Sequence, residues 1–295
     1  MHCTVPRVYA AVVVTYSAPA EVLDRCLRSI VEAGGIDHIV LVDNGGRAVV
    51  AEDLEGAVEV IALDNPGYGA AANRGFAAAA DADGIALLND DVVVQRDWFQ
   101  PLADRLAAPY VGAVQPMLVG ADHGVVTSLG VRLDRFGAGS DIGDGDPVPA
   151  DRSPSELHIF NGGAVVFDPR FLRVTGGFDE SLFLYYEDVD LALRGRQGGR
   201  WRYLLVPESV VEHRRGTSTS ADTEGTRFHQ ERNRLWIAFR HGSPGTILGA
   251  LWLSIRRLRH PPRSVHRRAL LAGLAGAPGR LVQRVRAPGT RTARR

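Results

Sequence analysis

Short apolar runs alternate with amphipathic segments along the first part of the chain. Four apolar runs have the length of buried strands, at residues 9–15, 36–42, 58–63 and 85–88. Residues 19–33 carry apolar side chains at helical spacing, and an Ala-rich helix is expected at residues 70–80. Strands that alternate with helices form parallel sheets with right-handed crossovers, so this pattern predicts a doubly wound α/β fold.

Three polar residues interrupt the apolar segment at residues 87–94, which reads Leu-Leu-Asn-Asp-Asp-Val-Val-Val. Asn89, Asp90 and Asp91 would project from the carboxyl end of a buried strand, where open α/β sheets bind their ligands. Adjacent carboxylates repel each other unless a positive charge lies beside them, and a hard divalent cation would supply that charge. A solvated Asp-Asp turn explains the same residues, and the pair alone does not separate the two interpretations.

A glycine-rich turn at residues 64–69 precedes the Ala-rich helix. Its backbone N–H groups could face a phosphate, although its spacing matches neither a P-loop nor a dinucleotide-binding fingerprint. A helix at residues 98–107 and a strand at 112–119 follow, and then residues 120–156 show no clear periodicity. A stretch of this length without periodicity is usually functional or mobile in a compact domain.

Two further groups of polar residues lie in the second half of the chain. Glu187, Asp188 and Asp190 follow an aromatic run and precede a short helix expected at residues 191–196. Acids in a first helical turn are favoured by the helix macrodipole, and spacing alone favours this structural explanation. An isolated histidine is also more often structural, but His213 follows a strand and precedes arginines and hydroxyls, a setting that favours anion or metal binding.

The charge balance divides the chain into two parts. All 34 basic residues are arginines and they equal the acids in number, but residues 240–295 contain thirteen arginines and no acid. Such a tail suggests an anionic partner surface. The chain has two cysteines and no disulfide framework, which favours a reducing, cytoplasmic compartment. No signal peptide is expected, and no apolar stretch reaches the roughly 18 residues of a membrane-spanning helix.

The basic tail has the pattern of an amphipathic helix. One apolar stripe consists of Ile247, Leu248, Leu251, Trp252, Ile255 and Leu258, and a poorer one of Leu270, Leu271, Leu274, Leu281 and Val285. Arginine, tryptophan and leucine on such a helix predict an element in the membrane interface. The alternative is a helix that packs on the core or on a dimer partner, followed by a disordered end. Nucleic acid is not expected as a partner, because the body is acidic and carries no nucleic-acid motif.

The order of these motifs resembles family 2 glycosyltransferases, the inverting, metal-dependent transferases of the GT-A fold. The likeness is greatest to the bacterial rhamnosyltransferase branch that builds cell-wall and surface polysaccharides. It covers roughly residues 8–235 and rests on motifs at residues 13–17, 42–45, 65–75, 88–91, 176–180, 186–190 and 213–218. The resemblance predicts a Rossmann-like, mostly parallel sheet with helices on both faces, a GT-A domain at 1–240, and a partly disordered helical tail at 241–295.

The resemblance also implies roles for individual residues. It makes Asp188 the general base with Glu187 close by, and it makes Asp91 and His213 the ligands of a Mg²⁺ or Mn²⁺ ion. Asn89 stands at the first position of the family's Asp-x-Asp-like motif, which leaves one carboxylate fewer for the cation. The residues implied near the nucleotide sugar are Thr15, Tyr16, Asp43, Gly67, Asn73, Asn89, Asp90 and Ser218.

The implied activity is transfer of a sugar, with L-rhamnose a candidate, from a nucleoside diphosphate donor to a saccharide or polyprenyl-linked acceptor. The implied place is the cytoplasmic face of the membrane, with a homodimer as one possible state. Two other classes compete with this interpretation. A dinucleotide-dependent oxidoreductase would need Gly-x-Gly-x-x-Gly after the first strand, where this chain has Thr-Tyr-Ser-Ala-Pro. A non-catalytic polysaccharide-binding or scaffold protein could retain the same fold.

Overall fold

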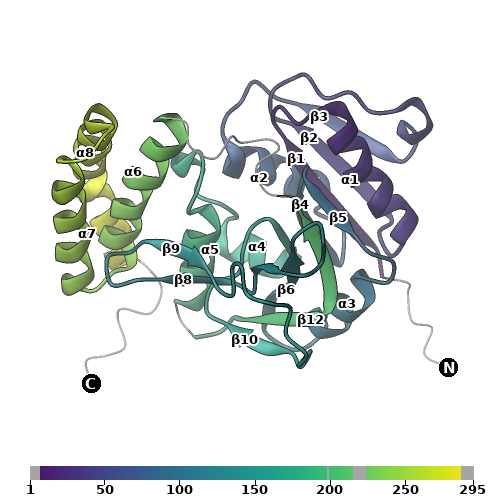
Figure 1. The fold of residues 1–295 in the computed structure, drawn as a ribbon. Helices are drawn as coiled ribbons and strands as arrows, with labels where there is room; N and C mark the ends of the chain where they lie inside the picture. The colour runs from purple at the N-terminus through teal and green to yellow at the C-terminus, as the bar shows by residue number, and fades with distance from the viewer. Residues whose placement is uncertain (1–6, 198, 215–223, 287–295) are drawn as a thin grey trace.

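A large mixed sheet organises the computed structural model, which describes residues 7–197, 199–214 and 224–286 (Figure 1). Its main path runs β10 (Ser155–Leu157), β12 (Arg202–His213), β6 (Val111–Val119), β11 (Ala164–Phe167), β4 (Gly84–Asn89), β1 (Tyr9–Thr15), β2 (His38–Asp43) and β3 (Val58–Ala62). Two short strands join it at the side, β5 (Val92–Val94) on β12 and β7 (Val126–Ser128) on β6.

The sheet is mostly parallel, as the sequence pattern predicts. β3, β2, β1 and β4 run in one direction, and β12 runs parallel to β6. β11 lies between β4 and β6 and is antiparallel to both, so β6 points the same way as β4. The carboxyl ends of β1, β2, β4, β6 and β12 therefore meet at one edge, where α/β sheets bind ligands.

Helices cover both faces of the sheet. One face carries α1 (Ala20–Ala33) and α3 (Phe99–Leu106). The other carries α2 (Tyr68–Ala78), α4 (Pro169–Thr175) and α5 (Glu187–Arg196). Successive side chains of a strand point to opposite faces, so Val12 belongs to one core and Val13 to the other. A strand buried on both faces is apolar throughout, which is why the pattern located β1.

The stretch at residues 120–156 contains short strands that the sequence pattern does not show. β8 (Val131–Leu133) and β9 (Gly139–Asp141) form a two-stranded sheet of their own, and β10 follows. Three residues are too few to produce a periodic signal, so these strands could not be read from the alternation of side chains. The β8–β9 hairpin brings Asp141 toward the site described below.

Three helices follow β12, namely α6 (Glu224–His241), α7 (Pro244–Arg257) and α8 (Arg263–Arg286). They lie beside α5, on the opposite side of the molecule from α1 (Figure 1). The three share a small core around Leu235, Phe239 and Ala250. No helix among the described residues is both long enough and apolar enough to cross a membrane.

The apolar stripes expected in the tail are only partly covered by this packing. On α7, Leu248, Trp252 and Ile255 are 68%, 51% and 56% exposed, while Ala250 is buried. On α8, Leu271 and Leu274 are also exposed. The tail thus packs on α6 with one set of residues and leaves a second apolar set on the surface.

A buried ion network joins α5 to α6. Asp190 of α5 is 1% exposed and accepts hydrogen bonds from Arg194 at 2.6 Å and from Arg240 at 2.9 Å. The Nε2 atom of His241 lies 2.8 Å from the same carboxylate. Burial alone would raise the pKa of Asp190, but the His241 hydrogen bond and the two arginine charges outweigh it and lower the pKa. The network fixes the first turn of α5 against α6.

We predict that Asp190→Asn lowers the free energy of unfolding by about 3–5 kcal/mol, because it leaves the largely buried Arg194 without a carboxylate and removes one of the two carboxylates that Arg240 contacts. Urea denaturation at pH 7 measures this change. Asp81→Asn, at an exposed position, is the matched control and should change stability by less than about 0.5 kcal/mol. A loss below about 1 kcal/mol for Asp190→Asn would contradict this role.

Candidate active site

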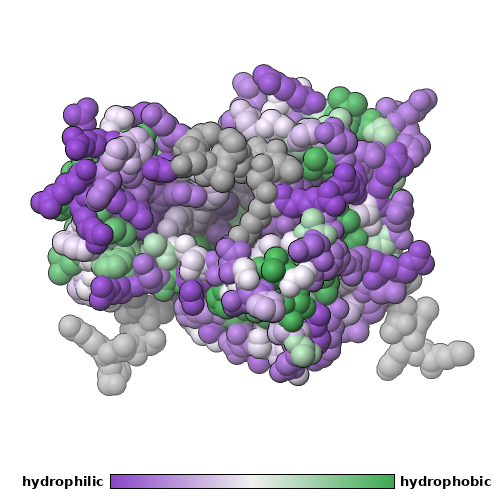
Figure 2. Space-filling view, viewed as in Figure 1, coloured by the Kyte–Doolittle hydropathy of each residue, from purple (hydrophilic) through white to green (hydrophobic). Residues whose placement is uncertain are grey.

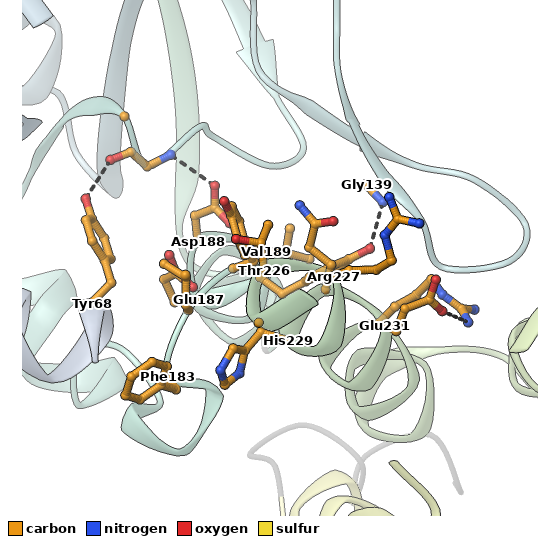
Figure 3. Close-up of a pocket in the computed structure, with 18 of the residues that line it drawn as sticks. Tyr68, Gly139, Phe183, Glu187, Asp188, Val189, Thr226, Arg227, His229 and Glu231 are labelled. Atoms are coloured by element: carbon orange, nitrogen blue, oxygen red, sulfur yellow. Dashed lines mark hydrogen bonds and ion pairs between the residues drawn. The ribbon is translucent and has the colours of Figure 1, made fainter. Parts of the chain in front are cut away.

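A cavity of about 1150 Å³ opens at the carboxyl ends of β1, β2 and β4 and extends to α6 and the α7–α8 turn. Figure 3 shows its middle part, where Glu187 and Asp188 lie between Tyr68 on one side and Glu231 on the other. Sites for one small ligand usually measure about 300–1,000 Å³. This cavity is slightly larger than that range.

Polar side chains gather at the sheet end of the cavity. The Tyr68 hydroxyl donates to Asn89 Oδ1 at 2.9 Å, which fixes the amide at the end of β4. Asn44 Nδ2 donates to Asn65 Oδ1 at 3.2 Å. Among the described residues, nothing hydrogen-bonds to the buried Asn44 Oδ1. A buried acceptor of this kind is available to an N–H group of a ligand.

The pairing of β5 with β12 brings Asp91 and His213 together. Val92 lies opposite His213 in the antiparallel register, and Asp91 comes directly before Val92. His213 Nε2 is 3.3 Å from Asp91 Oδ1. Nδ1 of the same ring is buried and has no hydrogen-bond partner within the described part of the chain. A carboxylate and an imidazole are thus placed together at the edge of the cavity, where His213 and Asp90 belong to the lining and Asp91 does not.

Glu187 and Asp188 occupy the first turn of α5 and line the middle of the cavity. Asp188 accepts hydrogen bonds from the backbone N–H groups of Gly162, at 3.0 Å, and Val189, at 2.7 Å. Burial raises the pKa of Asp188 to about 6, while these two N–H groups limit the rise. Burial, and then the charge of Asp188, raise the pKa of Glu187 to about 8. The environment therefore keeps Glu187 protonated at a pH where Asp188 is ionised.

The backbone just before these acids has an unusual conformation. Phe183, Tyr185 and Tyr186 all have positive φ, at 65°, 67° and 73°. Asn233 of α6 is fully buried and its Nδ2 donates to the carbonyls of Leu182, Leu184 and Tyr185, at 2.8–2.9 Å. Positive φ at bulky residues is strained and persists only where the surroundings enforce it. Asn233 is the side chain that enforces it here.

The residues expected at the site divide into two groups. Those that line the cavity are Tyr16, Asn89, Asp90, Glu187, Asp188 and His213. Those that the structure describes but places behind the lining are Thr15, Asp43, Gly67, Asn73 and Asp91. Ser218 lies outside the described residues.

Two of the residues behind the lining shape the chain instead of facing the cavity. Asp43 accepts hydrogen bonds from the N–H groups of Gly45 and Ala48 and so closes the turn after β2. Asn73 bonds to both the N–H and the carbonyl of Phe178, which ties α2 to the segment before α5. Asn73 thus makes a structural contact, and its expected position near the nucleotide stays a prediction.

Other residues of the cavity were not expected from the sequence. Asn44, Asn65, Tyr68 and Asp141 line it, as do several charged residues of α6 and the α7–α8 turn. Asn44 and Asn65 belong to turns that the sequence marks only as turns, and Asp141 belongs to a strand too short to detect. Their proximity to a strand end was the available signal for the two asparagines.

Comparison with known proteins agrees with this geometry. The model of "Glycosyl transferase family 2" matches residues 10–134. Proteins from two strains of Mycobacterium tuberculosis, named N-acetylglucosaminyl-diphospho-decaprenol L-rhamnosyltransferase, are 30% identical over 263 residues, which is 79% of this chain and 85% of theirs. The chain belongs to glycosyltransferase family 2.

This family 2 glycosyltransferase also shares its fold with solved structures. GalNAc-T7 with UDP, GalNAc and Mn²⁺ aligns with a TM-score of 0.66 and 14% identity, over 96% of this chain and 58% of that one. Mannosyltransferase PcManGT from Pyrobaculum calidifontis, in complex with GDP-Man and Mn²⁺, aligns with a TM-score of 0.54 and 15% identity, over 93% of this chain and 88% of that one. The predicted GT-A fold is confirmed.

The raised pKa of Glu187 makes a prediction about stability. Between the ordinary pKa of 4.5 and about 8, the folded state keeps a proton that the unfolded state has lost, so this group destabilises the fold as pH rises. Glu187→Gln removes that dependence. We therefore expect the variant's Tm, relative to wild type, to be higher at pH 9 than at pH 5.

Scanning calorimetry without metal or donor measures this difference. Glu55→Gln, at an exposed position, serves as the control and should show the same small difference at both pH values. An equal Tm difference for Glu187→Gln at pH 5 and pH 9 would show that Glu187 is ionised in the folded protein.

Proposed function

We propose that this glycosyltransferase moves a sugar, with L-rhamnose the first candidate, from a nucleoside diphosphate donor to a lipid-linked saccharide, with inversion at the anomeric carbon. The observation that supports this most directly is the position of Asp188. Its carboxylate is held by two backbone N–H groups in the same cavity as Asp90 and His213. The donor sugar follows from the relatives named rhamnosyltransferase.

A divalent cation, Mg²⁺ or Mn²⁺, fits the residues at the sheet end of the cavity. Asp91 and His213 would hold it together with the donor diphosphate, and their 3.3 Å separation suits two neighbouring ligands of one ion. Within the described ranges, no group of three or more His, Cys, Asp or Glu side chains is suited to a metal. Hard cations in such sites take their other ligands from substrate phosphates and water. When bound, the ion would neutralise charge on the leaving diphosphate.

Asp188 acts as the general base in this proposal. It takes the proton of the acceptor hydroxyl as that oxygen attacks the face of the sugar opposite the diphosphate. One ionised carboxylate is enough, because no covalent sugar intermediate forms in an inverting reaction. Glu187, whose pKa is raised further than that of Asp188, stays protonated and donates a hydrogen bond to substrate.

We propose that the tail, residues 241–295, brings the enzyme to the cytoplasmic face of an anionic membrane. The exposed apolar residues of α7 form part of the green area at the side of the molecule in Figure 2. Exposed arginines accompany them, including Arg256, Arg263, Arg267 and Arg268. Each arginine near an anionic surface contributes about 1 kcal/mol to binding. A diphospho-decaprenol acceptor, as in the relatives' name, would lie at such a surface. A role in cell-wall or surface polysaccharide synthesis follows from this acceptor, and a homodimer stays a prediction.

We predict that Asp188→Asn lowers kcat by about 10²–10⁴-fold while the donor Kd changes little, because the amide keeps the shape but cannot take a proton. Rates come from product formation with saturating donor, and donor Kd comes from calorimetry. Asp81→Asn should leave both values unchanged. Normal turnover by Asp188→Asn would assign the base to another group.

We predict that Mn²⁺ and a nucleotide sugar raise the Tm of the wild type together, because a ligand of the folded state stabilises it by mass action. A panel of UDP-, GDP- and dTDP-sugars identifies the donor. Asp91→Ala should lose the Mn²⁺-dependent part of the shift, and His213→Ala should lose less. Full transfer activity in EDTA would exclude the proposed role of the cation.

A further inference from the structure

Basic residues outnumber acidic ones in the lining at the end of the cavity farthest from Tyr68. This end is walled by α6 and by the turn between α7 and α8, whose basic lining residues are Arg227, His229, Arg234, Arg257, His260 and His266. Glu231 is the only acid that these helices contribute to the lining among the described residues. Nothing assigned to the donor, the cation or the general base accounts for this concentration of positive charge.

The contacts of Glu231 show which basic residues hold the helices together and which could bind a ligand. Arg234 is 1% exposed and donates to the carbonyls of Phe136 and Ala250 and to the Ser254 hydroxyl, besides facing Glu231 at 3.4 Å. It therefore belongs to the packing between α6 and α7. Arg234 and Arg257 both pair with Glu231, so these three groups together keep one net positive charge for a ligand.

Arg257, His260 and His266 line the cavity at this end. The Arg257 side chain is 36% exposed and ion-pairs with Glu231 through one nitrogen. A guanidinium has five N–H donors in a planar fork, so most of them are still available. His266 is 6% exposed, and its Nδ1 lies 3.6 Å from Glu231 without a hydrogen bond. His260 is exposed and completes a group that we call the basic rim: Arg257, His260 and His266.

We propose that the basic rim binds the diphosphate of a lipid-linked sugar acceptor. This inference rests on the proposed glycosyltransferase function and names the residues that would hold the second substrate. A guanidinium fork matches the geometry of phosphate oxygens and binds them with two parallel hydrogen bonds. The cavity is continuous from Asp188 to the rim, so a sugar whose hydroxyl reaches Asp188 can keep its diphosphate at the rim.

Exposed apolar residues near the rim favour a lipid ester over a free diphosphate. Ile255 lies two residues before Arg257 and is 56% exposed, and Trp252 is exposed one turn earlier. Residues two positions apart on a helix point to nearly opposite sides, so these apolar side chains lie on the other side of α7 from Arg257. A polyprenyl chain that leaves the rim would pass the C-terminal end of α7 to reach this apolar face, which we have proposed to lie at the membrane.

The basic rim and the proposed donor site lie in different parts of the cavity. The donor diphosphate is proposed at Asp91 and His213, on the Tyr68 side of Asp188. Inversion requires the acceptor to approach from the side opposite the leaving diphosphate, which is the side of α6 and the rim. The two diphosphates are therefore held at opposite ends of one cavity, with Asp188 between them.

The test uses a short-chain probe, an N-acetylglucosaminyl diphosphate ester of farnesol, and the matching farnesyl glycoside without the diphosphate. Binding to the full-length protein is measured by calorimetry in detergent, and donor binding is measured separately. Wild type should bind the diphosphate ester at least about tenfold more tightly than the glycoside. Arg257→Gln should weaken binding of the ester about 10- to 100-fold and leave donor Kd unchanged.

Arg259→Gln is the matched control, because Arg259 is exposed in the same turn and does not line the cavity. It should bind the probe as wild type does. Arg257→Lys, which keeps the charge beside Glu231 but loses the fork, guards against misfolding and should weaken binding about three- to tenfold. A thermal unfolding curve for each variant checks that it is folded.

Three results would overturn the proposal. The first is equal binding of the diphosphate ester and the glycoside by wild type, and the second is unchanged binding of the ester by Arg257→Gln. The third is a loss of binding to phosphatidylglycerol vesicles by Arg257→Gln without loss of probe binding, which would assign the rim to lipid headgroups. Donor hydrolysis by wild type in any of these cases would show that the proposed transferase function stands without the rim.

Discussion

The strained segment from Phe183 to Tyr186 is the constraint on which the site depends. Three bulky residues with positive φ lie directly before Glu187, and each costs about 1–3 kcal/mol. One amide group, Asn233 Nδ2, bonds to three carbonyls of the segment and holds it in this form. The resulting turn directs the first residues of α5 into the cavity. Without it, Glu187 and Asp188 would have no fixed direction.

The helices after β12 are therefore part of the active site's support. Asn233 and Arg240 of α6 contact the strained segment and Asp190, and Arg280 of α8 donates to Asp179 at 2.5 Å and to Ser181. The Cζ atoms of Arg232 and Arg280 each lie 4.3 Å from the ring centroid of Trp236. The tail that begins at residue 241 shares a hydrophobic core with α6. The proposed division at residue 240 is therefore a division of function, because the two parts pack together as one structural unit. If α7 and α8 contact a membrane, that contact bears on α6, which supports the segment directly before Asp188.

The sequence patterns predicted the elements whose structure is determined by the residues within them. β1, β2 and β4 are buried on both faces, and their continuous apolar runs show it. Asn89, Asp90 and Asp91 could be predicted as site residues because they stand at the end of β4. The roles of the acids in α5 could not be read in this way, because Asp188 and Asp190 are two residues apart and differ only in what surrounds them. Asp188 faces the cavity, whereas two arginines and His241 hold Asp190.

The remaining features depend on contacts between distant segments. Positive φ at Phe183, Tyr185 and Tyr186 contradicts the preference of aromatic residues and is held by contacts from distant segments, among them Asn233 and the backbone N–H of Tyr68. The proximity of Asp91 and His213 depends on the pairing of β5 with β12, and β5 has three residues. The basic rim depends on the turn between two tail helices. No periodicity or motif spacing carries such information, since each contact is decided by tertiary packing.

In the proposed reaction one ionised carboxylate, Asp188, drives a single displacement at the anomeric carbon. NMR can compare the anomeric configuration of the transferred sugar in the product with that in the donor. A single displacement inverts the anomeric centre, so we expect inversion. Retention would require a second nucleophile in the cavity and would contradict the proposed reaction.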